Sequence, residues 1–259
     1  MHPKKLFLAF PWIFHATELA WWDRPSICKN HWRDFVCFDY PKQFFDIEIF
    51  IHSCIEYIER YNPDSLIICW ISFGETVARK LMERKSDLPI ALYISVCWAS
   101  NQHLLSQKKQ LPLKLLSRCD NRLTRKIGKA ILQSLRHIET KWNRQPIARN
   151  NFYRHSWLSP KQQQAIIDAG SQWLGAWLYD RCIYLHQGQH GKHILHDTIA
   201  IYSTNDDFFT NPHENATLLT QQCSKKSSII EVNGGGHASI VEFPEKRNPV
   251  LENILTGIF

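Results

Sequence analysis

The chain has 259 residues, a formal net charge of +7 and eight cysteines. This length suffices for one large domain, and ten Trp, fourteen Phe and eight Tyr residues supply enough apolar bulk to exclude intrinsic disorder. The cysteines form no C-x-x-C pair and no Cys/His cluster at zinc spacing, so we expect reduced thiols and neither a disulfide framework nor a metal site.

The N-terminal segment has the basic and apolar parts of a secretory signal, because Lys4 and Lys5 precede the run Leu6–Phe10. We expect a first β-strand instead, since the apolar run is short and Pro11 interrupts it. Spanning a bilayer requires roughly 20 apolar residues, and no stretch of the chain approaches that length. The sequence therefore predicts a soluble, cytoplasmic protein without stable membrane insertion.

Short apolar runs alternate with helical patterns along most of the chain. The predicted strands are Leu6–Phe10, Phe35–Phe38, Leu66–Cys69, Ile90–Cys97, Thr198–Tyr202 and Ser228–Val232. The predicted helices are Phe44–Tyr61, Glu75–Arg84, Pro212–Cys223 and Pro249–Leu255. This alternation predicts an α/β fold, and the continuous apolar character of the strands is typical of a mostly parallel sheet flanked by helices.

Residues 101–197 interrupt this rhythm, because they contain no convincing strand and have helical patterns. We interpret them as a helical lid inserted into a core formed by residues 1–100 and 198–259. Residues 101–160 hold six Lys and seven Arg but only Asp120 and Glu139, a net charge of +11. The whole chain carries +7, so the remainder carries −4 by subtraction. The basic excess of the protein therefore belongs to the predicted lid.

Five basic residues of the predicted lid share one face of a helix. Their spacing of 4, 4, 3 and 4 residues follows the helical repeat, and they are Lys114, Arg118, Arg122, Arg125 and Lys129. Like charges at i,i+4 destabilise a helix by a few tenths of a kcal/mol per pair, and few acidic residues relieve them here. We interpret this basic face as a docking surface for an anionic partner; an ordinary solvated helix face is the alternative.

Ser72 follows the buried strand pattern Leu66–Cys69, and a glycine two places on leads into the helical pattern Glu75–Arg84. A serine at such a strand-to-helix elbow has its hydroxyl exposed, and the first N–H groups of the helix are ready to receive an oxyanion. This arrangement predicts a nucleophilic serine and hence a serine hydrolase.

A serine nucleophile needs a base and an acid that orients the base, and two later strands supply candidates. The strand Thr198–Tyr202 is followed by Asp206 and Asp207, and Ser228–Val232 leads through three glycines to His237. The order Ser, Asp, His matches that of α/β-hydrolases. We predict Asp206 as the acid of the triad, with Asp207 as the alternative.

These segments resemble an α/β-hydrolase over nearly the whole chain. Ile71–Gly74 resembles the second half of the nucleophile elbow, Tyr202–Asp206 resembles the strand that ends in G-x-x-D, and Gly236–Ala238 resembles the segment with the catalytic histidine. The resemblance implies that the backbone N–H groups of Trp12 and Phe73 form the oxyanion hole. It implies no metal and no organic cofactor.

The sequence departs from the family pattern in two places. Trp70 stands where the elbow has its first glycine, a position at which a small residue allows close strand–helix packing. Phe10-Pro-Trp12 replaces the His-Gly pair of the oxyanion loop, and Pro11 has no N–H to donate.

Within the family, the chain resembles the pimeloyl-acyl carrier protein methyl ester esterases of biotin biosynthesis. The likeness rests on Phe35–Tyr40, on Phe44–Asp46 and on the basic lid. It implies a serine carboxylesterase that removes the methyl ester from pimeloyl-acyl carrier protein while lid arginines hold the acidic carrier. An acyl thioesterase, a general carboxylesterase and an inactive relative that binds an acidic protein are the alternatives. No nucleic-acid-binding motif accompanies the charge, so we expect no nucleic-acid partner.

Overall fold

The computed structural model describes residues 3–10, 34–38, 47–71, 74–97, 194, 196–206, 209–223, 225–233 and 244–256. All of its helices and strands belong to one compact unit, which comprises Met1–Tyr40, Asp46–Ser106 and Gly188–Phe259. The predicted lid, residues 101–197, lies outside the described residues except for Ile194 and residues 196–197.

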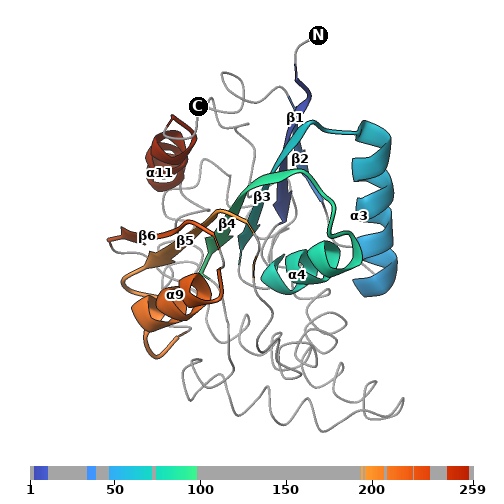
Figure 1. The fold of residues 1–259 in the computed structure, drawn as a ribbon. Helices are drawn as coiled ribbons and strands as arrows, with labels where there is room; N and C mark the ends of the chain where they lie inside the picture. The colour runs from blue at the N-terminus through green and yellow to red at the C-terminus, as the bar shows by residue number, and fades with distance from the viewer. Residues whose placement is uncertain are drawn as a thin grey trace, which may run out of the picture. The chain divides into compact units, whose positions relative to one another are not determined.

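Six described strands form one parallel sheet at the centre of this unit (Figure 1). Their spatial order is β2-β1-β3-β4-β5-β6, and every neighbouring pair is parallel. Each predicted strand is confirmed to within two residues at either end. The strands are β1 (Lys5–Phe10), β2 (Asp34–Cys37), β3 (Ser65–Ile71), β4 (Ile90–Val96), β5 (Thr198–Ser203) and β6 (Ser227–Val232).

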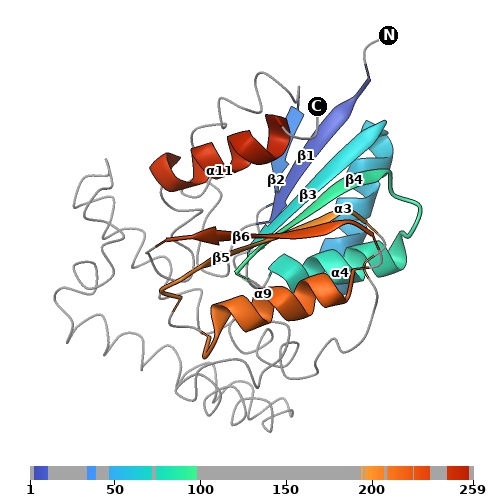
Figure 2. The same cartoon turned by 60° about the vertical axis from the view of Figure 1, so that its left-hand side comes forward.

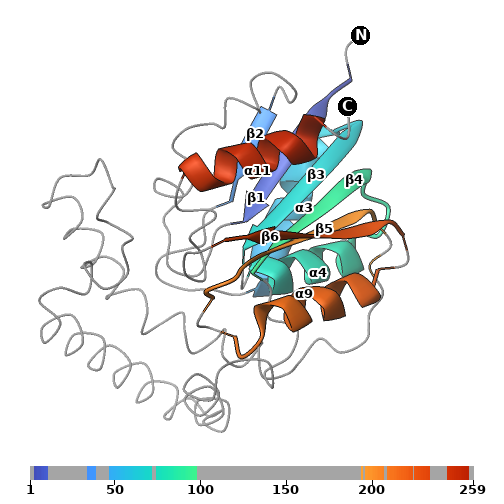
Figure 3. The same cartoon turned by 90° about the vertical axis from the view of Figure 1, so that its left-hand side faces the viewer.

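Helices cover both faces of the sheet, as predicted. The described helices are α3 (Ile47–Tyr61), α4 (Gly74–Arg84), α9 (Pro212–Gln221) and α11 (Pro244–Thr256). Figures 2 and 3 show α11 on the side of the sheet opposite to α4 and α9. None of the described helices is both long enough and apolar enough to cross a membrane.

The predicted start of the last helix, Pro249, is wrong. Proline is favoured in the first turn of a helix, which is why the sequence placed the start there. In the structure α11 begins at Pro244, and Pro249 lies inside the helix at an exposed position. The proline ring removes one backbone hydrogen bond at this point, and the helix continues to Thr256.

Local sequence signals explain the start of α9 and the buried face of α3. Asn211 caps α9, because its side-chain oxygen accepts a hydrogen bond from the N–H of Glu214 at 3.1 Å, and Pro212 occupies the first turn. In α3 the buried positions recur at helical spacing and face inward, namely Ile47, Phe50, Ile51, Cys54 and Ile58. Local capping and apolar periodicity therefore agree with the observed packing.

A layer of three aromatic side chains crosses the sheet at its centre. Phe10 of β1 lies opposite Trp70 of β3 in the strand register, and their rings stack with centroids 4.3 Å apart. Trp70 also contacts Tyr93 of β4, with a centroid distance of 5.9 Å. All three side chains are completely buried. The tryptophan at the usual glycine position therefore fills the core beneath α4.

We expect Trp70→Ala to lower the free energy of unfolding by about 3–5 kcal/mol, because it leaves a cavity between the Phe10 and Tyr93 rings. Urea unfolding followed by circular dichroism measures the change. Ile49→Ala, at a position that is 62% exposed on α3, is the control and should change stability by no more than about 0.5 kcal/mol. Equal effects of the two substitutions would contradict the packing described for Trp70.

Candidate active site

The carboxyl ends of the parallel strands lie together at one edge of the sheet. In the strand register Ile71 at the end of β3 lies opposite Val96, and Ser203 at the end of β5 lies opposite Val232. Chain segments that follow these strands therefore leave the sheet at the same edge. Open α/β sheets bind their ligands at this edge, which makes it the candidate active site.

The junction between β3 and α4 has the length that a nucleophile elbow requires. β3 ends at Ile71 and α4 begins at Gly74, so only Ser72 and Phe73 separate strand from helix. These two residues lie outside the described residues. The strand before them and the helix after them are both present, which is the context that a nucleophile elbow requires, and Ser72 stays a predicted nucleophile.

Asp206 follows β5 in a turn that is tied to the ends of two strands. Its N–H donates to the Ser203 carbonyl at 3.2 Å, and the N–H of Thr204 donates to the Val232 carbonyl at 3.1 Å. The Asp206 side chain is 3% exposed. Since β4 lies between β3 and β5, the chain leaves the end of β5 about 10 Å, two strand spacings, from the end of β3.

The other predicted site residues lie outside the described residues. These are Trp12 and Phe73 of the predicted oxyanion hole, Ser72, His237, the alternative acid Asp207, and the basic residues Lys114, Arg118, Arg122, Arg125 and Lys129. The described part of the chain reaches Asn233, the residue after β6, and His237 comes four positions later. Their assignments stay predictions.

A small cavity lies between β4, β5 and α9, and its walls include Ser95, Cys97, Tyr202 and Asn215. Its volume of about 10 Å³ gives room for one water molecule at most, so it cannot accept an acyl chain. Within the described ranges, no group of three or more His, Cys, Asp or Glu side chains is arranged to hold a metal ion.

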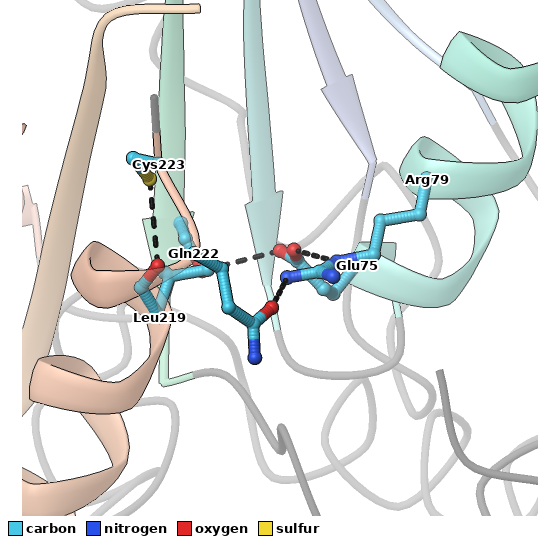
Figure 4. Close-up of polar contacts among 6 residues, drawn as sticks. Glu75, Arg79, Leu219, Gln222 and Cys223 are labelled. Atoms are coloured by element: carbon cyan, nitrogen blue, oxygen red, sulfur yellow. Dashed lines mark hydrogen bonds and ion pairs between the residues drawn. The ribbon is translucent and has the colours of Figure 1, made fainter. Parts of the chain in front are cut away.

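The first two turns of α4 hold a buried ion pair that the sequence did not predict (Figure 4). Glu75 is the second residue of α4, and its Oε1 accepts a hydrogen bond from Nε of Arg79 at 2.9 Å. The two side chains are each 3% exposed. Glu–Arg spacing of i,i+4 is visible in the sequence, but such pairs commonly lie on helix surfaces, so the spacing alone did not predict burial.

Polar contacts extend the ion pair to the sheet and to the end of α9. Oε2 of Glu75 accepts a hydrogen bond from the Ser95 hydroxyl on β4 at 3.2 Å. Nη2 of Arg79 donates to Oε1 of Gln222, the C-cap residue of α9, at 2.9 Å (Figure 4). The first turn of α4 is therefore joined through side chains to β4 and to the segment that leads into β6.

Neighbouring ionisable groups respond to the negative charge of Glu75. Burial, together with the Glu75 carboxylate, raises the pKa of Tyr93 well above its usual range. Burial is the largest influence on Arg79 and opposes its charged form, but Glu75, Tyr93 and Cys223 together outweigh it, so the pKa of the guanidinium is raised. Burial is also the main cause of the raised pKa of Cys223, and Glu75 adds to it. The guanidinium of Arg79 therefore stays charged beside the carboxylate.

Solved structures similar to this chain include esterases and epoxide hydrolases. An esterase from Thermogutta terrifontis is 14% identical with a TM-score of 0.62, over 98% of this chain and 90% of that one. A carboxylesterase structure from Nitrososphaera gargenis is 12% identical with a TM-score of 0.60, over 99% and 91%. An epoxide hydrolase from Bacillus megaterium is 12% identical with a TM-score of 0.64, over 98% and 94%.

The described strands and helices, together with this likeness over nearly the full length of the chains, define the α/β-hydrolase fold. The predicted α/β-hydrolase fold of the core is confirmed, and the helical lid stays a prediction. No protein-family model matches the sequence, and no curated protein sequence matches it significantly. At 12–14% identity the structural likeness extends to the fold and not to the reaction.

We expect Arg79→Met to lower the free energy of unfolding by about 3–5 kcal/mol, since it leaves the carboxylate of Glu75 buried without its counter-ion. Urea unfolding at neutral pH provides the measurement. The double variant Glu75→Gln/Arg79→Met removes both charges and should be more stable than the single variant by about 1–4 kcal/mol. If the double variant is no more stable than Arg79→Met, the pair does not act through its charges.

Proposed function

We propose that this protein is a serine hydrolase of carboxylic esters, with Ser72 as nucleophile, His237 as general base and Asp206 as the acid that orients the histidine. The two-residue junction at Ser72, between the end of β3 and the start of α4, is the observation that carries the proposal. The buried Asp206 at the same edge of the sheet supports it.

In the proposed reaction His237 takes the proton of the Ser72 hydroxyl as the oxygen attacks the ester carbonyl. The backbone N–H groups of Trp12 and Phe73 stabilise the oxyanion, and the N-terminus of α4 adds its positive potential. His237 then protonates the departing alcohol. A water molecule, activated by the same histidine, attacks the acyl-enzyme and releases the carboxylic acid.

The residue at the elbow favours acyl transfer over the epoxide opening named for some of the similar structures. Attack of a serine on an epoxide carbon would form an ether, which contains no carbonyl for water to attack. Attack of the same serine on an ester forms an acyl-enzyme, which water resolves. Ser72 therefore suits esters or thioesters and does not suit epoxides.

We expect Ser72→Ala to abolish hydrolysis of p-nitrophenyl butyrate, lowering kcat by at least about 10³-fold. Asp206→Asn should lower kcat by about 10³–10⁴-fold, because the neutral amide no longer stabilises the histidine in its working tautomer. Asp207→Asn is the matched control and should retain kcat. The release of nitrophenolate provides the measurement, and a reversed pattern at positions 206 and 207 would assign Asp207 as the acid.

For the substrate, we propose the methyl ester of a pimeloyl chain attached to acyl carrier protein, as in biotin biosynthesis. Residues 101–160 carry a net charge of +11 while the rest of the chain carries −4, which supports an acidic macromolecular partner. The five basic residues named above would bind the carrier, and the acyl chain would reach Ser72 from there. A thioesterase acting on the same carrier uses the same residues and differs only in the bond that breaks.

Mass spectrometry of methyl-pimeloyl-acyl carrier protein distinguishes these reactions. We expect wild type to remove the methyl group and leave the thioester intact, and Ser72→Ala to leave the substrate unchanged. Loss of the whole acyl chain would favour the thioesterase, and an unchanged substrate would reject this carrier-bound ester.

Charge reversal at Arg118, Arg122 and Arg125 to Glu should raise KM for the carrier-bound substrate at least about 10-fold, through like-charge repulsion. Hydrolysis of p-nitrophenyl butyrate should not change, since this ester needs no docking surface. The matched control reverses three exposed charges of the core: Arg60, Lys225 and Lys226. Equal rises in KM for the two triple variants would indicate a general effect of net charge and would reject a specific docking surface.

A further inference from the structure

The buried ion pair lies at the end of α4 that the proposed reaction uses. Glu75 is three residues beyond Ser72 and sits in the first turn of α4. The N-terminus of a helix carries the equivalent of roughly +0.5 of an elementary charge, which is what stabilises an anion there. The full negative charge of an unpaired carboxylate in the same turn would exceed this partial charge and would oppose an oxyanion.

Arg79 removes this conflict without leaving the helix. Its guanidinium lies 2.9 Å from Glu75, and burial of both side chains excludes the water that would otherwise screen the carboxylate. The charged and titratable groups that face Glu75 among the described residues are Arg79 on α4, Tyr93 on β4 and Cys223 after α9. Of these three, only Arg79 supplies a positive charge.

Hydrogen bonds from outside α4 hold the ion pair in its observed geometry. The Ser95 hydroxyl on β4 donates a hydrogen bond to one carboxylate oxygen of Glu75, and Arg79 donates a hydrogen bond to Gln222 at the end of α9. Both anchors belong to elements that are not part of α4. Opening the pair by rotation of either side chain would therefore break a hydrogen bond to another element of the core.

Building on the proposed function, we propose that Arg79 is a positioning residue for catalysis: it cancels the charge of Glu75, so that the N-terminus of α4 keeps the positive potential that stabilises the oxyanion formed at Ser72. The effect belongs to the chemical step. It should therefore change kcat for ester hydrolysis and leave KM largely unchanged.

The test compares four proteins with p-nitrophenyl butyrate: wild type, Arg79→Met, Glu75→Gln and the double variant. Arg79→Met should lower kcat about 10-fold or more, because an uncancelled charge acts at short range in a medium of low dielectric constant. Glu75→Gln keeps side-chain atoms able to contact Ser95 and Arg79 but removes the negative charge, so kcat should rise. The double variant carries neither charge and should recover kcat to within about 3-fold of wild type.

A purely structural role gives a different pattern, since the double variant loses every contact that Arg79 makes. A double variant as slow as Arg79→Met, or a Glu75→Gln variant with lowered kcat, would overturn the inference. Arg79→Lys keeps the charge with fewer contacts and should keep most of kcat. If Arg79→Met does not fold, the comparison of wild type with Glu75→Gln and the double variant decides. Ser72→Ala separates the two proposals. If wild type and Ser72→Ala are equally inactive, the proposed function fails and the role of Arg79 fails with it; if only Ser72→Ala is inactive, the Arg79 and Glu75 variants decide the role of Arg79 alone.

Discussion

The parallel register of the strands is the constraint on which the rest of the structure depends. Because β3, β4, β5 and β6 run in the same direction without a reversal, their carboxyl ends share one edge. A junction of two residues then suffices to turn the chain from β3 into α4, and a hydrogen-bonded turn suffices to hold Asp206 beside the end of β6. The candidate catalytic residues lie in short segments after the strands, and the parallel sheet brings these segments to the same edge.

The core beneath this edge contains two features that a nucleophile elbow built from small residues does not have. Trp70 places a large ring at the end of β3, and α4 buries a salt bridge in its first two turns. Buried ion pairs commonly contribute little to stability because desolvation offsets their attraction. We propose that the pair beside the junction acts chiefly through the local electric potential and less through the free energy of folding.

The fold was predictable from the sequence because apolar runs and turn signals are local. The runs at Leu66–Cys69 and Thr198–Tyr202 identified two central strands, and Pro212 identified the start of α9. The three candidate residues Ser72, Asp206 and His237 each follow a predicted strand, in the order that α/β-hydrolases have. Asp206 is now located in a buried turn at the predicted edge, whereas the pairing of Ser72 with His237 stays a prediction.

The Glu75–Arg79 pair was not predictable, for a physical reason. An i,i+4 spacing of opposite charges has the same appearance in a sequence whether the helix face meets water or a sheet. Burial of this face depends on Ser95 and on Gln222, which is 143 residues from Arg79. At Pro249 the local signal was strong but wrong. A proline is typical of a helix start, yet α11 begins five residues earlier at Pro244 and continues through Pro249.

The pairing of β4 with β5 has a consequence for how such a chain can diverge. These strands are adjacent in the sheet, yet residues 97–197 lie between them along the sequence. The free-energy cost of closing so long a segment depends only weakly on its length, since halving or doubling the length changes this cost by about 0.6 kcal/mol. The strand pairing therefore tolerates exchange of the intervening segment for one of another length or charge. Under the proposed function, substrate choice can change in evolution through this segment while the sheet and the buried pair are inherited unaltered.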